Sequence, residues 1–228
     1  MLIIVDKRIS EPALRELSSW GKILLFESEN ITYKAISCHP DIFFCIVNQK
    51  LIVAPNCPEE FKNNLKANEI RFSEGITKVG MQYPESAHYN AVVTETHLIH
   101  NLTVTEKTIL STARNLMQTH VNQAYTRCNL VHLGGKNYIT SDKGIEKVLV
   151  SSGLNVFYIN PRQTILSGFE HGFFGGCCGF FDKKLFVNGS LDHLSEKTDL
   201  QTFCRNSDVE IIELSHEKLI DIGSILFL

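Results

Sequence analysis

The order in which short strands and helices follow one another most constrains what this chain can fold into. Four times, a strand, a tight polar turn, a second strand, a helix and a further strand can be read in succession. The hairpins are predicted over residues 41–55, 89–100, 129–140 and 178–187. A fifth copy is divided, with residues 221–228 at one end of the chain and residues 2–5, followed by a helix, at the other. This division predicts a closed ring of five units in which the two chain ends share one unit.

The predicted helices recur roughly every 45 residues, within the range typical of repeat architectures. Capping residues and apolar spacing place their starts near residues 10, 58, 105, 141 and 195. The second of these is expected to be longer, with an apolar face from Ile109 to Leu116, and to be followed by a strand near residues 121–125. The alternative is an ordinary open α/β sheet. We therefore expect an α/β fold, a five-fold pseudo-symmetric propeller of ββαβ-type units whose fifth unit is split between the termini.

Composition favours one folded domain over residues 1–228. With 43% hydrophobic residues and no linker-like stretch, a chain of this length can bury a full core. The net charge of −3 and scattered basic residues argue against a nucleic-acid surface, and no apolar run reaches the length of a membrane span. Seven irregularly spaced cysteines and a strand-like N-terminus indicate a reducing cytoplasm. We expect a cytoplasmic protein that binds a small molecule and needs no cofactor; its oligomeric state stays open.

Polar residues precede the first strand of each predicted hairpin. In a closed ring these strands lie nearest the axis, so the side chains at their starts should converge on one central pocket. The five places are His39-Pro40-Asp41, Tyr89-Asn90, Cys128-Asn129, His171 to Cys178, and Gly223-Ser224. Among them, the candidate substrate-binding residues are His39, Asp41, Asn90 and Asn129, with the Asp41 carboxylate holding a cation. The alternative is that Pro40 and Asp41 form a turn and that the asparagines are structural.

The segment from Gly168 to Phe181 contains five glycines among apolar residues, which is costly unless the backbone turns sharply or approaches something closely. His171 could supply a base, and Cys177 or Cys178 a nucleophilic thiol. The alternative is that both cysteines are buried core residues. A metal site built from these residues and Cys128 lacks paired ligand spacing, so no metal is predicted.

The five-unit order resembles the guanidine-modifying-enzyme, or pentein, fold, whose members include arginine and agmatine deiminases, amidinotransferases and dimethylarginine hydrolases. Three segments look like those of a bacterial family of that fold that has no established activity. They are His39-Pro-Asp-Ile42, Thr140-Ser-Asp-Lys-Gly-Ile145 and His171-Gly-Phe-Phe-Gly-Gly-Cys177. The resemblance covers essentially the whole chain, and it implies the closed ring and a small guanidino- or amino-acid-like ligand.

Two departures from the pentein enzymes bear on chemistry. The resemblance implies a nucleophilic cysteine late in the chain, but this sequence has Phe227 there. It also implies an acid two residues after a histidine, but Gly172-Phe173 follow His171. We therefore expect a ligand-binding protein without the usual late cysteine. The alternative is a cysteine-dependent hydrolase or transferase acting on a small guanidino or amide substrate through Cys177 or Cys178 with His171. A purely structural partner module has only the fold to support it.

Overall fold

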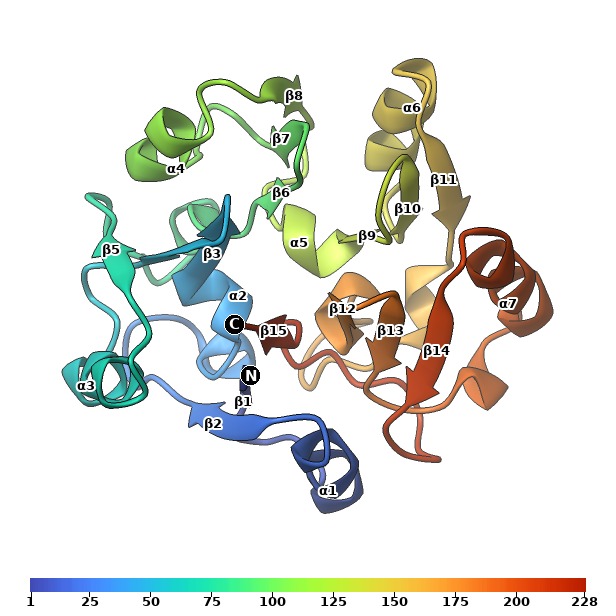
Figure 1. Ribbon diagram of the computed structural model, residues 1–228, viewed down its shortest axis with the longest axis horizontal. Helices are drawn as coiled ribbons and strands as arrows, with labels where there is room; N and C mark the ends of the chain where they lie inside the picture. The colour runs from blue at the N-terminus through green and yellow to red at the C-terminus, as the bar shows by residue number, and fades with distance from the viewer.

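Five small three-stranded sheets surround a common axis in a computed structural model that describes all 228 residues (Figure 1). In each sheet, an antiparallel pair is followed by a helix that crosses over to a third strand, parallel to the second. The pairing orders are β15-β1-β2, β3-β4-β5, β6-β7-β8, β9-β10-β11 and β12-β13-β14. The expected five-unit α/β propeller is thus confirmed, and the open sheet is excluded.

The strands of the four continuous units are β3 (Phe44–Val47), β4 (Lys50–Val53), β5 (Phe72–Glu74), β6 (Val92–Val93), β7 (His97–His100), β8 (Met117–His120), β9 (Leu130–His132), β10 (Asn137–Thr140), β11 (Asn155–Tyr158), β12 (Cys178–Phe181), β13 (Lys184–Val187) and β14 (Glu210–Glu213). The crossover helices are α1 (Glu11–Ser18), α3 (Glu59–Ala67), α4 (Lys107–Thr112), α6 (Lys143–Ser151) and α7 (Lys197–Asn206). These helices form the periphery of the ring, outside the strands (Figure 1).

The two chain ends complete the fifth unit. Strand β15 (Leu226–Phe227) pairs antiparallel with β1 (Leu2–Asp6), which pairs in parallel with β2 (Lys22–Phe26) across helix α1. Backbone hydrogen bonds of 2.9 and 3.0 Å join Leu2 and Leu228 in both directions. The termini therefore lie side by side near the axis (Figure 1), as the division of the repeat predicts.

Three hairpin turns have the chemistry predicted from sequence. Both central residues have positive φ in Asn48-Gln49, Gly134-Gly135 and Asp182-Lys183. Turns of this mirror-image kind match the right-handed twist of the strands that they join. They fix the register of each hairpin, so that alternate side chains of the first strand face the axis.

The second unit departs from the prediction. Helix α4 ends at Thr112, and the third strand is β8, at Met117–His120, not at residues 121–125. The reason is the pairing of β8 with β7, which puts His97 opposite Met117 and His100 opposite His120. Leu116 ends up half-buried against the neighbouring core instead of extending a helix face.

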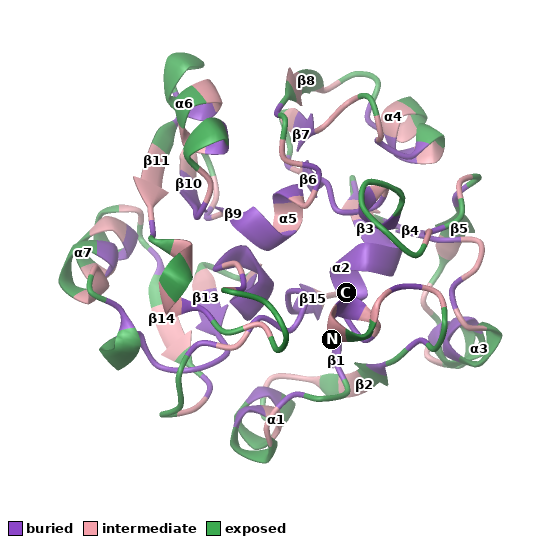
Figure 2. Cartoon of the chain, turned by 180° about the vertical axis from the view of Figure 1, so that it is seen from behind, coloured by how far each residue is buried: buried purple, intermediate pink, exposed green.

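Short helical segments precede three of the inner strands. They are α2 (Pro40–Phe43), α5 (Thr126–Asn129) and the 3₁₀ turn η4 (Gly175–Cys177). Strand β3 therefore begins at Phe44, three residues later than predicted, because Pro40 suits the first turn of a helix. These segments and the inner strands are largely buried around the axis (Figure 2). No helix of the structure is long and apolar enough to cross a membrane.

Candidate functional site

One residue from each of the five units meets at the axis, where the inner strands begin. They are Asp41, Asn90, Cys128, Gly175 and Ser224, and all are buried. The Ser224 hydroxyl lies 2.8 Å from Asp41 Oδ2 and 3.1 Å from the Gly175 carbonyl oxygen, and Cys128 Sγ donates to Asp41 Oδ2 at 3.1 Å. Asn90 Nδ2 donates to the Asp41 carbonyl oxygen at 3.1 Å and lies 3.2 Å from Cys128 Sγ. We call these five residues the polar layer. The strand starts converge as predicted, but of the five only Gly175 and Ser224 line the axial cavity.

Asp41 is the centre of the polar layer. Its Oδ2 accepts from Ser224 and Cys128, whereas its Oδ1 is buried without any hydrogen-bond partner. Burial raises the pKa of the Asp41 carboxyl above its ordinary value, more than the hydrogen bonds and the nearby Arg127 charge lower it. A buried acceptor without a partner costs free energy, so Oδ1 marks a place where a donor is missing.

Cys128 holds its proton in this arrangement. Its pKa is raised well above the ordinary value, chiefly by burial and then by the negative charges of Asp41 and Asp221. The thiol therefore acts as a hydrogen-bond donor to Asp41 at neutral pH. Asn90 fixes the helical turn that carries it, because Asn90 Oδ1 accepts from the Cys128 backbone N–H at 3.1 Å.

His39, on the chain just before Asp41, lies between two further buried carboxylates. Its Nε2 is 3.8 Å from Asp6 Oδ2 and its Nδ1 is 3.8 Å from Asp221 Oδ1, and neither nitrogen forms a hydrogen bond. Burial, with a smaller effect of the Arg8 charge, lowers the pKa of His39 to about 3. The imidazole is therefore neutral at physiological pH, and Asp6 is instead paired with Arg8.

Asp221 is held by the glycine-rich segment. Its Oδ2 accepts from the Phe173 backbone N–H and its Oδ1 from that of Gly223, both at 3.0 Å. Burial and then the Asp41 charge raise the pKa of Asp221 to about 7. A Cβ on Gly176 would lie 2.0 Å from Asp221 Oδ1. The glycines therefore serve a close approach, one of the two possibilities raised by the sequence.

Three aromatic side chains lie over this region. The hydroxyl groups of Tyr33 and Tyr125 are 3.3 Å apart, and the rings of Tyr33 and Phe169 are 5.6 Å apart. Burial raises the pKa of Tyr33, and the charges of Asp41 and Asp221 contribute in the same direction. We call Tyr33, Tyr125 and Phe169 the aromatic cover; Phe169 is the most exposed of the three.

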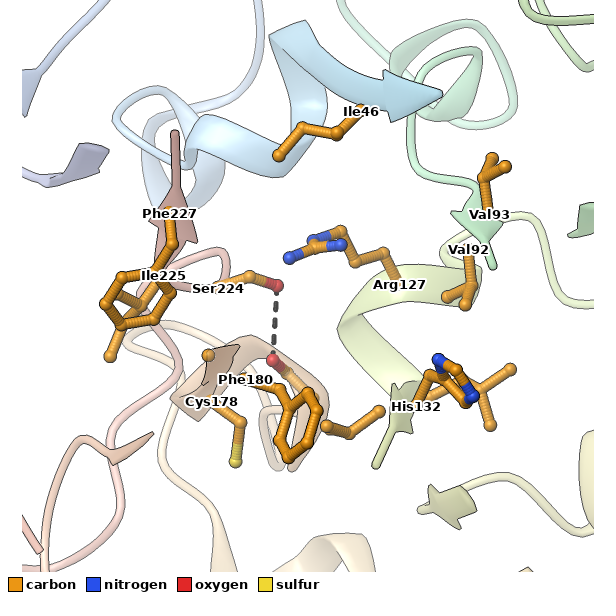
Figure 3. Close-up of a pocket in the computed structure, with 14 residues that line it drawn as sticks. Ile46, Val92, Val93, Arg127, His132, Cys178, Phe180, Ser224, Ile225 and Phe227 are labelled. Atoms are coloured by element: carbon orange, nitrogen blue, oxygen red, sulfur yellow. Dashed lines mark hydrogen bonds between the residues drawn. The ribbon is translucent and has the colours of Figure 1, made fainter. Parts of the chain in front are cut away.

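A cavity of about 190 Å³ runs along the axis inside the ring of inner strands. Ser224 and Gly175 belong to its wall, whereas Asp41 and Cys128 do not, so the polar layer closes one end of it. Arg127 extends across this end toward Ser224 (Figure 3). The remaining lining residues are Ile46, Val92, Val93, Leu130, Val131, His132, Cys178, Gly179, Phe180, Ile225 and Phe227.

The structure brings some of the predicted residues together and separates others. Asp41 and Asn90 meet in the polar layer, and His39 lies beside Asp221. Asn129 instead faces its own unit, where Nδ2 donates to the Tyr125 carbonyl oxygen and Oδ1 accepts from Ser141.

The three candidate catalytic residues do not share a cavity. Cys177 is buried and packs in an apolar cluster. Cys178 lines the axial cavity, whereas His171 does not. Burial raises the pKa of both thiols well above the ordinary value. His171 is half-buried, and its Nδ1 lies 2.9 Å from the carbonyl oxygen of Gly172. No three His, Cys, Asp or Glu side chains are grouped so as to hold a metal ion.

Sequence reasoning did not single out Asp6, Arg127 or Asp221. Asp6 ends the axial strand β1, whereas Asp221 lies in the irregular segment that precedes β15. An acid at a strand end is a signal that points to Asp6, whereas Asp221 has no such signal. Arg127 carries no comparable signal, because a lone arginine before a cysteine is not a motif.

Comparison with known proteins identifies the family and the fold of this chain. A family model described as "Family of unknown function (DUF6873)" matches residues 4–226. No curated protein matches the sequence. Among solved structures, C. jejuni agmatine deiminase with substrate bound has a TM-score of 0.57 at 9% identity, covering 99% of this chain and 92% of that one. The amidinotransferase SxtG from Microseira wollei has a TM-score of 0.55 at 10% identity, covering 95% and 88%.

A third similar structure is DDAH from Pseudomonas aeruginosa in complex with citrulline. Its TM-score is 0.54 at 9% identity, covering 94% of this chain and 92% of that one. All three are guanidine-modifying enzymes of the pentein fold, which this chain shares. Identities this low establish the fold alone.

Proposed function

Since the chain belongs to the DUF6873 family and has the pentein fold, we propose that it binds a small guanidino or amino-acid-like cation at the polar layer. Asp41 would hold the cationic group. The observation that carries this proposal is the orphaned Asp41 Oδ1, a fully buried carboxylate oxygen without a donor. Among the similar structures, DDAH holds citrulline, an amino acid, and agmatine deiminase holds its substrate, so both bind small molecules.

Charge supports a cationic ligand. Asp6 has its own partner in Arg8, but Asp41 and Asp221 form no ion pair with any lysine or arginine. Two buried carboxylates without a direct ion-pair partner favour their protonated forms, which is the direction of both pKa shifts. A bound cation would supply the missing charge and let both groups ionise.

Shape supports a planar donor group. A guanidinium presents its N–H groups in one plane and can donate two parallel hydrogen bonds to a carboxylate. The aromatic cover adds ring faces, which attract cations. Phe169 is exposed and packs on the half-buried Tyr33, so the ligand would enter by displacing these two side chains.

The chemistry of the thiols favours binding over catalysis. Cysteine attack requires a thiolate, and burial raises the pKa of Cys128, Cys177 and Cys178 far above neutrality. The Cys128 thiol also donates a hydrogen bond to Asp41, which makes it part of the hydrogen-bond network and not a free nucleophile. The cysteine-dependent alternative with His171 stays a prediction that thiol labelling tests.

The test is a matched pair of ligands titrated by calorimetry. L-Arginine and L-citrulline differ in that one carries a guanidinium and the other a neutral ureido group. We expect arginine to bind more tightly by about tenfold or more, as for hydrogen bonds to charged groups. Asp41→Asn should remove that preference, while Asp199→Asn on the exposed face of α7 should keep it. Equal binding of the two ligands, or an unchanged preference in Asp41→Asn, would reject the proposal.

A further inference from the structure

The axial cavity has a mostly apolar wall and a positively charged floor. Nine of its 14 lining residues are hydrophobic, and they come from the inner strands of all five units. At the floor, Arg127 is the one charged side chain (Figure 3). His132 is the other ionisable base of the lining, and burial lowers its pKa below the ordinary value, so it is neutral at pH 7.

The Arg127 guanidinium lies near enough to Asp41 to lower the pKa of that carboxyl, yet it has no direct ion-pair partner. It forms no ion pair with any carboxylate, it makes no side-chain hydrogen bond, and its Nε is buried without a partner. The Arg127 side chain is partly buried on α5, where its backbone N–H donates to the Asn90 carbonyl oxygen at 2.9 Å. A cation in such a place normally pairs with an anion, because partial burial without a partner costs free energy.

The cavity opens at the end opposite Arg127. One residue from each inner strand is only partly buried there, whereas the residues nearer the polar layer are buried. These five mouth residues are Ile46, Val93, His132, Phe180 and Phe227. A small molecule can therefore reach the guanidinium from solvent along an apolar channel, without disturbing the polar layer or the aromatic cover.

We infer that this cavity is a second binding site, for a small monocarboxylate with a compact apolar group. The carboxylate would pair with Arg127, whose planar donors suit it, and the apolar group would lie among the strand side chains. Single charge and small size follow from the lining: it offers one cation and a volume of about 190 Å³. A second anionic group would have no partner in the apolar wall.

This site is independent of the cation site. Ser224 belongs to both, but its hydroxyl is already used by Asp41 and Gly175. Opposite charges define the two: the Asp41 and Asp221 carboxylates for the cation site, and the Arg127 guanidinium for the axial cavity. The two sites therefore select opposite ligand charges and can be tested separately.

The experiment uses benzoate, benzamide and benzylammonium as probes, which share a ring and differ in charge. Binding is followed by chemical-shift changes of the valine, leucine and isoleucine methyl groups in labelled protein. We expect benzoate to shift the methyls of Val92, Val93 and Leu130, benzamide to bind about tenfold to a hundredfold more weakly, and benzylammonium to leave them unmoved. Equal effects of the three probes, or shifts confined to other methyls, would overturn the inference.

Variants give a second readout. Arg127→Met should weaken benzoate binding to the level of benzamide, and Arg114→Met, which removes an exposed arginine, should not. If Arg127→Met does not fold, Val93→Phe at the mouth should exclude benzoate while leaving the charge in place. Asp41→Asn should retain benzoate binding, so loss of the cation site and loss of this site are distinguishable. Undiminished benzoate binding in both Arg127→Met and Val93→Phe would refute the site.

Discussion

Ser224 and Asp41 lie 183 positions apart in the chain, yet the Ser224 hydroxyl is 2.8 Å from the Asp41 carboxylate. The contact joins the last unit of the ring to the first at the axis. It is reinforced by the backbone, where the Asp41 N–H donates to the Gly223 carbonyl oxygen at 3.1 Å. Ring closure and the chemistry of the candidate site are therefore built by the same residues.

Removing the hydroxyl at this contact should weaken the whole fold. We expect Ser224→Ala to lower the free energy of unfolding by about 1–3 kcal/mol, because Asp41 Oδ2 loses one of two donors in a buried setting. Urea denaturation measures the change. Ser111→Ala is the control, since its hydroxyl is exposed and bonds only within α4. Equal, small effects of both substitutions would contradict the role assigned to Ser224.

The raised pKa of Asp221 makes stability depend on pH. The folded-state pKa is about 7, against an ordinary value of 3.8. Between these values the folded state keeps a proton that the unfolded state releases, so rising pH destabilises the fold by at most about 1.4 kcal/mol per pH unit. His39 acts with the opposite sign, because its lowered pKa of about 3 makes the unfolded state bind more protons below pH 6.5.

Comparison with Asp221→Asn isolates the Asp221 contribution. The amide loses one backbone contact, which shifts stability by an amount independent of pH. The difference in unfolding free energy between wild type and Asp221→Asn should therefore fall as pH rises from 5 to 7.5, and then level off. Asp199→Asn, on the exposed face of α7, is the control substitution. A difference that is flat, or that grows with pH, would show that Asp221 is ionised in the folded protein.

The glycine-rich segment should tolerate no side chain at Gly176. The added Cβ would lie 2.0 Å from Asp221 Oδ1 and 2.4 Å from its Cγ, so either the segment or Asp221 must move. We expect Gly176→Ala to cost about 1–3 kcal/mol or more in thermal or urea unfolding. At Gly144, on α6, the nearest atom to an added Cβ is Asp142 Oδ1 at 3.0 Å, and alanine there should cost far less. Similar stabilities for the two variants would contradict the close packing at Asp221.

Thiol labelling tests the cysteine-dependent alternative. All seven cysteines are buried, and burial raises the pKa of Cys177 and Cys178 well above the ordinary value. Alkylation of the folded protein at pH 7 should be slow at every cysteine and become fast only after denaturation. Rapid labelling confined to Cys177 or Cys178, with a midpoint well below the ordinary thiol pKa of about 8.5, would favour a nucleophile.

The sequence predicts the ring well because the signals for it are local. The turn residues Asn48-Gln49 and Asp182-Lys183 and the recurring helix caps each specify one unit, and the split copy specifies closure. In the second unit, the helix periodicity from Ile109 to Leu116 predicts the third strand too late in the chain. That periodicity is local, whereas the register of β8 depends on its partner strand β7. Local signals cannot decide a contact made with a distant strand.

The candidate functional site is harder to predict from local sequence signals than the ring is. Asp41 and Asn90 precede inner strands, so the ring geometry alone predicts that they meet. Asn129 also precedes an inner strand, but its side chain points toward Ser141. Its direction is set by the short helix α5, which no sequence pattern predicts. The unpaired charge of Arg127 is visible only once every neighbouring carboxylate has been placed.

The central claim is that the buried carboxyl groups of Asp41 and Asp221 bind a cation and lose their protons when it binds. Methylguanidinium, which has no group that titrates near neutrality, tests it by calorimetry at pH 6.5 in two buffers of different ionisation enthalpy. We expect binding to release protons from the protein at pH 6.5, and the share released by Asp221 to fall toward zero at pH 9, well above its pKa of about 7. Binding without proton release at pH 6.5, or no binding at all, would contradict it.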